Sequence, residues 1–146
     1  MTCGGLHVTV HIDGGARGNP GPAGAGVVIR NDADEVVLYE GGQFLGKATN
    51  NVAEYSALIA GLRAAKKIHA ERVAVASDSQ LLVRQMNGQY RVKNDGLKPL
   101  HRQAQELQHG FAECIFRHVR REENEPADRL VNMAIDQEQD VLDAAR

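Results

Sequence analysis

The feature of this sequence that most constrains its fold is the order of its hydrophobic patterns, in which strand-like segments precede the first helix. Residues 7–13 alternate strictly, with Val8, Val10 and Ile12 on one side and polar residues on the other, which is typical of a strand with one buried face. The glycine-rich residues 14–26 predict an irregular turn or wide bulge, and residues 27–30 and 36–44 predict two more strands that pair with each other. Three strands with short connections predict an antiparallel meander.

Helices and short apolar segments alternate in the rest of the chain. Apolar residues recur at helical spacing after a capping Thr49 or Asn50, which predicts a helix that ends near residues 67–70. Residues 72–78 form an apolar run between two helices, as interior parallel strands do. Further helices are expected over 81–86, from Pro99 to about 109, and from about Pro126, with a fifth strand over 115–119.

This order of elements predicts an α/β fold with a five-stranded mixed sheet, in which the meander is extended by parallel strands and helices pack on both faces. Right-handed crossovers would place the first and fourth strands side by side, or nearly so. The chain has 146 residues, enough for one sizeable core, so residues 1–146 are expected to form a single domain.

The apolar segments and the cysteine content indicate where the protein is located in the cell. No stretch approaches the roughly 20 apolar residues of a membrane span, and the first residues lack the blocks of a signal peptide, so a soluble, cytoplasmic protein without membrane contact is expected. Cys3 and Cys114 are the only cysteines, too few for a disulfide framework or a zinc site, and they fit a reducing compartment.

The formal net charge of −2 excludes a general electrostatic attraction to nucleic acid. Charge is nevertheless uneven: residues 84–102 carry five basic residues against one acidic, whereas residues 122–146 carry eight acidic against two basic. Solvated helix faces explain both stretches equally simply, and the acidic residues 141–146 are expected to fray.

Four acidic residues hold corresponding places in the predicted elements: Asp13 late in a strand, Asp78 at a strand end, and Glu54 and Asp128 in first helical turns. A mixed sheet would bring all four to one edge. Clustered carboxylates need a counter-charge, and their hard oxygens suit Mg²⁺ or Mn²⁺. Two such ions about 4 Å apart would serve phosphoryl chemistry.

Each acidic residue also has a structural explanation when it is taken singly. Glu54 and Asp128 would be stabilised by the helix dipole. Asp78 would cap the helix that follows it, and Asp13 would lead into the glycine-rich turn. The set of four together favours the metal site.

Four segments resemble the signature motifs of ribonuclease H type 1. They are residues 13–21 (DGGARGNPG), 49–55 (TNNVAEY), 78–80 (DSQ) and 124–128 (NEPAD), and they occur in the family's order over nearly the whole chain. The resemblance implies the ribonuclease H-like fold and metal-dependent cleavage of the RNA strand of RNA/DNA hybrids, leaving 5′-phosphate and 3′-hydroxyl ends. Asp13, Glu54, Asp78 and Asp128 match the catalytic acids, with Asp13 bridging two Mg²⁺ or Mn²⁺ ions.

The resemblance also implies the contacts with substrate. Distinguishing RNA from DNA requires groups that hydrogen-bond the 2′-hydroxyl, and side-chain amides both donate and accept. The positions that match the family's contacts to the hybrid are Asn19, Lys47, Thr49, Asn50, Asn51, Gln80 and Asn124, of which Lys47 and Thr49 match contacts to a phosphate of the DNA strand. Taken alone, Asn19 is also a turn residue, Asn50 a cap and Lys47 a surface lysine.

The chain departs from the family pattern in the loop before Asp128 and after the segment 81–86. Many members place a mobile histidine in that loop, and residues 119–124 contain none; Arg120, Arg121 or Glu123 are candidates to replace it. Some members insert a basic helical handle where this chain has only residues 89–97. We expect this short segment to keep part of the phosphate contact, and we expect no separate hybrid-binding domain before His7.

Two other functions remain open from the sequence. One is a related carboxylate-dependent nuclease, such as an exonuclease, a Holliday-junction resolvase or a strand-transfer nuclease. The other is a catalytically inactive nucleic-acid-binding module that keeps the fold. The motifs 49–51 and 78–80 disfavour the first, and the presence of all four acidic residues disfavours the second. A monomer is expected.

Overall fold

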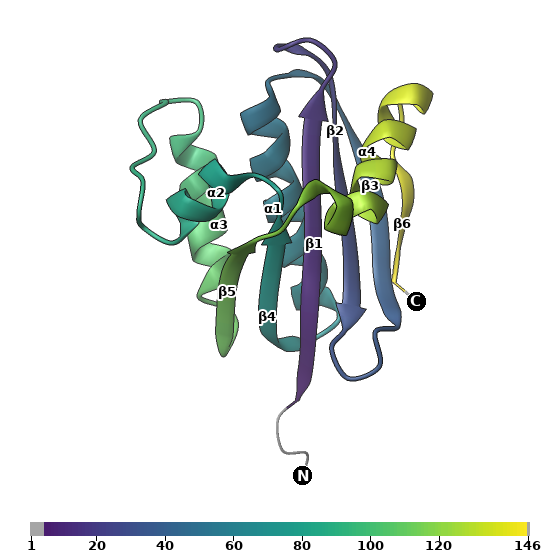
Figure 1. The fold of residues 1–146 in the computed structure, drawn as a ribbon, viewed down its shortest axis with the longest axis vertical. Helices are drawn as coiled ribbons and strands as arrows, with labels where there is room; N and C mark the ends of the chain where they lie inside the picture. Colours follow the sequence, from purple (N-terminus) through teal and green to yellow (C-terminus); the bar gives the residue numbers. More distant parts are fainter. Residues whose placement is uncertain (1–4, 146) are drawn as a thin grey trace.

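The computed structural model describes residues 5–145. In chain order its elements are β1 (Leu6–Ala16), β2 (Gly21–Asn31), β3 (Val37–Ala48), α1 (Asn50–Lys67), β4 (Ala70–Ser77), α2 (Gln80–Met86), α3 (Lys98–Gln108), β5 (Glu113–His118), the 3-10 helix η1 (Arg121–Asn124), α4 (Glu125–Gln137) and β6 (Val141–Ala145) (Figure 1). No helix within the described range is long and apolar enough to cross a membrane. Cys114 is a free, half-buried thiol, and Cys3 lies outside the described residues.

The strands form one mixed sheet in the order β5-β4-β1-β2-β3-β6. β1, β2 and β3 form the predicted antiparallel meander. β4 lies parallel beside β1, and β5 lies parallel beside β4. The mixed architecture and the neighbouring first and fourth strands are therefore confirmed.

Two segments differ from the expectation. Residues 14–26 are not mainly an irregular turn, because β1 continues to Ala16 and β2 begins at Gly21, with Gly14 opposite Ala25 and Gly15 opposite Gly24. The chain end does not fray throughout: Val141–Ala145 pairs antiparallel with β3 as a sixth strand. The buried Val141 side chain, which packs against α4, anchors this strand.

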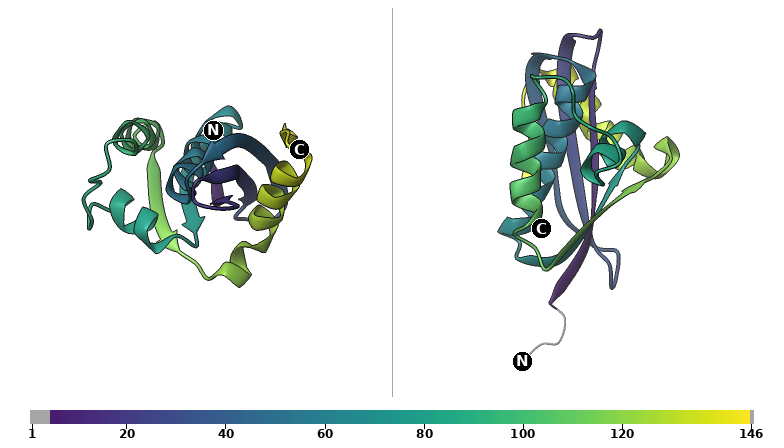
Figure 2. Two further views of the ribbon diagram at one scale, coloured as in Figure 1. Left: turned by 90° about the horizontal axis from the view of Figure 1, so that it is seen from above. Right: turned by 90° about the vertical axis from the view of Figure 1, so that its left-hand side faces the viewer.

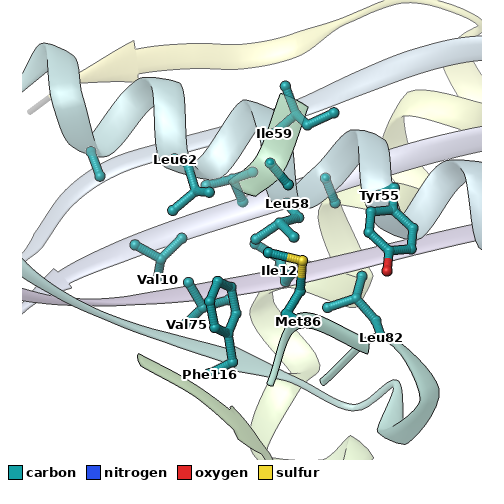
Figure 3. Close-up of a cluster of buried hydrophobic side chains, with 14 of the residues drawn as sticks. Val10, Ile12, Tyr55, Leu58, Ile59, Leu62, Val75, Leu82, Met86 and Phe116 are labelled. Atoms are coloured by element: carbon teal, nitrogen blue, oxygen red, sulfur yellow. The ribbon is translucent and has the colours of Figure 1, made fainter. Parts of the chain in front are cut away.

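The two faces of the sheet are covered by different helices (Figure 2). On one face α1 lies over β1 and β2 with α3 beside it, and α2 packs near β4 and β5. Figure 3 shows Leu58 and Leu62 of α1 among Val10, Ile12 and Val75 of the strands. On the other face α4 packs against β2 and β3, so that helices lie on both faces as predicted.

Candidate active site

Asp13 and Asp78 lie at neighbouring positions because β1 and β4 run parallel in register. Ile12 is opposite Ser77, the last residue of β4, so the residue that follows each of them emerges at the same level of the sheet. Ser77 is held in place by its backbone carbonyl, which accepts a hydrogen bond from Val119 N–H at 2.9 Å. Two carboxylates are thereby delivered side by side from adjacent strands.

Two glycines allow the helix starts to approach this point. A Cβ atom at Gly14 would collide with the backbone of Ala53 and Glu54, and one at Gly26 would collide with the carbonyl oxygen of Ala127. Gly26 is also the cross-strand partner of Asp13. The first turns of α1 and α4 therefore lie directly against the sheet, and they bring Glu54 and Asp128 to the end of β1.

All four predicted carboxylates line one open pocket of about 470 Å³. Burial, together with the negative charges of Asp78, Asp128 and Glu54 and a hydrogen bond shared with Asp128, raises the pKa of Asp13 to about 8. Burial also raises the pKa of Glu54 to about 7, with a contribution from Asp78, against an opposing hydrogen bond from Ser79. The structure thus gathers the four residues that the sequence singled out.

The donor set of this pocket fits divalent metal ions. Carboxylate oxygens are the ligands that Mg²⁺ and Mn²⁺ prefer. Burial and the neighbouring carboxylates both raise the pKa of Asp13, and a bound cation would favour its ionised form. As the side chains stand, no group of three or more His, Cys, Asp or Glu residues between positions 5 and 145 is arranged to hold an ion. Mg²⁺ commonly keeps several waters and takes only one or two carboxylates, which suits an open pocket.

A polar network along α4 supports Asp128 beside the pocket. Asn132 Nδ2 donates to the Asp128 backbone carbonyl at 3.2 Å and lies 3.5 Å from its Oδ2. Arg17 holds Asn132 through Oδ1 at 3.2 Å and pairs with Asp136 at 2.6 Å. No local sequence signal indicates the role of Arg17, Asn132 or Asp136, because it depends on the tip of the β1–β2 hairpin reaching α4.

Three of the predicted substrate residues are joined at the start of α1. Asn50 N–H donates to Asn19 Oδ1 at 3.1 Å, and Asn50 Oδ1 accepts from Ala16 N–H at 2.8 Å. Thr49 caps the helix by accepting from Val52 N–H at 3.2 Å. Thr49 is thus the helix cap and Asn19 lies in the turn between β1 and β2, whereas Asn50 is the first helical residue and not a cap. Asn50 also lines the carboxylate pocket.

Lys47, Asn51 and Gln80 are exposed around the same end of the molecule, on β3, α1 and α2. Gln80 follows Ser79, which lines the pocket. In the segment after α2, Arg91 and Lys93 are also exposed, while Val92 and Leu97 are buried in the core. Arg84 Nη1 donates to the Tyr90 hydroxyl at 2.6 Å, which fixes the start of that segment.

Asn124 stands apart from the other substrate candidates, because its side chain is fully buried. Its Nδ2 donates to the Ile12 carbonyl at 2.8 Å, and its Oδ1 lies 3.2 Å from His11 Nδ1. Burial lowers the pKa of His11, with Arg30 and Arg117 adding to the effect, so a neutral ring donates to Asn124. In this arrangement Asn124 ties the start of α4 to β1 and offers no surface to a ligand.

Arg121, one of the three candidates to replace the family's loop histidine, lies at the carboxylate pocket. It is exposed on η1 and lines the carboxylate pocket. Its position follows from the short β5–α4 connection, which crosses in front of β1 (Figure 1).

The mixed sheet and the carboxylates at the ends of its two central parallel strands together define a domain of the ribonuclease H-like class. A family model described as "Reverse transcriptase-like" matches residues 11–134. The bifunctional protein Rv2228c of Mycobacterium tuberculosis is 48% identical over 131 residues, which cover 90% of this chain and 36% of that protein. A Coxiella burnetii protein named Ribonuclease H is 34% identical over 146 residues, which cover 89% of this chain and 90% of the relative. The structure of LC11-RNase H1 in complex with an RNA/DNA hybrid matches with a TM-score of 0.85 at 42% identity, covering 90% of this chain and 98% of the other.

The chain belongs to the ribonuclease H family, type 1. It spans about a third of the length of the mycobacterial relatives that it matches, which are covered over 36% of their sequence.

Proposed function

We propose that this protein is a metal-dependent endonuclease that hydrolyses the RNA strand of RNA/DNA hybrids, leaving 5′-phosphate and 3′-hydroxyl ends. The observation that carries the proposal is the convergence of Asp13, Glu54, Asp78 and Asp128 in one open pocket. The relatives named for ribonuclease H activity and the hybrid bound in a similar structure support it.

The four carboxylates would hold two Mg²⁺ ions, with Mn²⁺ as a substitute. When bound, these ions supply Lewis-acid stabilisation of charge on the phosphate and activation of water. The chain's own contribution is to hold four oxygen-bearing side chains on rigid strand ends and helix starts, and to disfavour their simultaneous ionisation until cations arrive. No covalent protein intermediate is required.

Selection of the RNA strand is assigned to the amides beside the pocket. Asn19, Asn50, Asn51 and Gln80 would contact the minor groove of the hybrid, where amides both donate to and accept from a 2′-hydroxyl. Lys47 and Thr49 would hold a phosphate of the DNA strand. Asn124 is assigned a positioning role instead, because its amide is buried and bonded within the protein.

The four proposed metal ligands come from one chain, and we propose that the protein acts as a monomeric single domain. A cytoplasmic location is the expectation from its cysteine content.

The experiment that tests the function uses one internally labelled RNA, presented as an RNA/DNA hybrid, as an RNA/RNA duplex and as a single strand. Each is incubated with Mg²⁺, with Mn²⁺ or with chelator. We expect internal cuts in the hybrid alone and only with metal. Asp13→Asn should reduce the rate by at least about a thousandfold, because removing one carboxylate breaks the shared site.

The outcomes separate the alternatives. Hybrid binding without cuts under any metal would indicate the inactive binding module. Cuts that require a free end, so that end-blocked hybrids resist, would indicate an exonuclease. Glu106→Gln is the matched control, because Glu106 is an exposed residue of α3 outside the pocket, and it should leave the rate unchanged.

A further inference from the structure

Within residues 5–145, no helix covers the β4 and β5 half of the sheet face that carries α4. α4 packs against β2, β3 and part of β1, and the helices that contact β4 and β5 lie on the other face. The strand register places alternate residues of the uncovered half in rows: Arg117, Ala76 and His11 form one row, and Ile115, Ala74, Thr9 and Arg30 form the next. Ala74 lies at the centre of a hollow of about 730 Å³, and Ala76 in the neighbouring row is fully buried.

The end of this hollow nearest the carboxylate pocket is positively charged. Arg117 and Arg30 make no ion pair or side-chain hydrogen bond with any residue in the described range. The far end holds the acidic residues Asp32, Asp34, Glu35 and Glu113, of which Asp32 accepts from Thr9 Oγ1 at 2.7 Å and Glu113 lies 3.6 Å from Arg72. The two free guanidiniums therefore lie on the side toward the active site.

Two more arginines connect this end of the hollow to the pocket. Arg120 and Arg121 are exposed at the start of the loop that crosses β1, and neither forms an ion pair within residues 5–145. Arg121 lines the carboxylate pocket itself. Glu122 and Glu123 follow on η1, where Glu123 accepts from the Arg120 backbone N–H at 3.3 Å. We call Arg121, Arg120, Arg117 and Arg30 the arginine track.

We infer that the arginine track binds the phosphodiester backbone of single-stranded RNA that continues from a hybrid held at the carboxylate pocket. This inference rests on the proposed function. Guanidinium groups without protein partners suit phosphate oxygens, which they bind bidentately. The track begins inside the proposed cleavage site, where an RNA strand would already lie, and this favours RNA over an acidic protein segment as its occupant.

A single strand fits this path better than a duplex does. The path turns from the pocket around η1 into the hollow, and double-stranded nucleic acid is stiff over about 150 base pairs. Ile115 is 49% exposed beside Ala74 in the hollow and offers apolar surface to an unpaired base. The track would thus extend the substrate site past the end of the hybrid.

The test compares binding of a blunt hybrid with that of the same hybrid carrying a short single-stranded RNA tail at its 5′ or its 3′ end. Fluorescence anisotropy in chelator prevents cleavage. We expect a tail at one of the two ends to lower the Kd about tenfold at low salt. The double variant Arg30→Gln/Arg117→Gln should bring the ratio of the two Kd values close to one, and should reduce the salt slope by about 0.7 for each phosphate that the variant no longer binds.

The matched control is Arg63→Gln/Lys67→Gln, which removes the same charge from exposed positions of α1 and should keep the tail effect. Thermal melting confirms that both double variants fold. The inference is overturned if neither tail improves binding, if the ratio survives in Arg30→Gln/Arg117→Gln, or if a poly-glutamate peptide competes as well as the free RNA tail. Cleavage of the blunt hybrid by the parent tests the proposed function separately, so either can fail alone.

Discussion

The two faces of the sheet differ in how much apolar surface they bury. The face under α1 is a continuous apolar core, in which Leu58, Leu62 and Val10 are fully buried. The face under α4 contains glycines where the helix lies closest, and its cluster of buried apolar side chains is smaller. The face under α1 stabilises the fold. The face under α4 buries less apolar surface, and the four carboxylates lie together at its edge.

Placing four carboxylates together at the edge of the α4 face has an electrostatic cost. The raised pKa values of Asp13 and Glu54 mean that the folded protein without metal resists full ionisation of the pocket. The apolar face offsets that cost, so a rigid scaffold coexists with a strained charge cluster. Substitutions on the two faces should therefore differ in both size and pH dependence.

The largest loss of stability is expected on the α1 face. Leu58→Ala removes a fully buried side chain at the centre of the core, and should lower the free energy of unfolding by about 3–5 kcal/mol, since the cavity cannot close fully. Ile115→Ala, on the exposed surface of β5, should change it by less than about 0.5 kcal/mol. Urea denaturation measures both. A similar cost for the two variants would contradict the assignment of the core.

A smaller loss is expected where α4 touches the sheet. Gly26→Ala places a methyl group against the Ala127 carbonyl, and should lower the free energy of unfolding by about 2–3 kcal/mol through overpacking. It should also lower cleavage activity, because Asp128 is the next residue along α4. Gly15→Ala is the control, since its Cβ would meet only Val131 Cγ1 at 4.0 Å. If Gly26→Ala is as stable as Gly15→Ala, the close helix approach is not required.

Hydrophobic periodicity predicted the α1 face and most of the sheet. Alternation around Val8 and Val10 and the helical spacing of Leu58 and Leu62 are local signals, and both are confirmed. Hydrophobic periodicity did not predict the strand segments that are held by backbone pairing alone. The glycines of residues 14–26 carry no side-chain alternation, yet their backbones continue the ladder, and the sixth strand depends on an edge of β3 that only the folded sheet presents.

The four carboxylates were predictable because the order of the family motifs and the order of the expected strands and helices both indicate the same four residues. The role of Asn124 was not, because its signal as part of a motif is the same whether the amide faces substrate or the protein interior. Only the meeting of η1 with β1 decides this, and that contact joins residues 112 positions apart. Arg17 and Asn132 escaped notice for the same reason.

Asn124→Ala tests the contact that ties the start of α4 to β1. It would leave the Ile12 carbonyl and the His11 ring without their partner in a buried position, and should cost about 2–3 kcal/mol. Hybrid cleavage should fall while hybrid binding in chelator persists, because α4 loses its anchor and the substrate amides remain. Asn51→Ala, an exposed change at the start of α1, serves as the stability control. A larger loss of binding than of cleavage would return Asn124 to the substrate surface.

The smallest expected effect on stability concerns the charge cluster, and it has the opposite sign. The pKa of Asp13 rises on folding from 3.8 to about 8, so the folded state binds the proton more tightly and Asp13 favours folding in acid. That contribution is lost progressively as the pH rises from about 4 to about 8. In chelator, Asp13→Asn should therefore match the parent near about pH 4 and be the more stable of the two at higher pH, with a difference that grows as the pH rises toward about 8.

The measurement is thermal or urea unfolding across pH, with Glu106→Gln as the control for a change at an exposed carboxylate. Glu54, whose pKa is raised to about 7, should leave a residual pH slope in Asp13→Asn. Mg²⁺ should then reverse the order at about pH 8, because a ligand that binds only the folded state stabilises it and the variant lacks one of the proposed ligands. A variant that is less stable than the parent in chelator at about pH 8 would mean that the four carboxylates do not repel one another in the folded protein. The α4 face would then carry no electrostatic cost that distinguishes it from the α1 face.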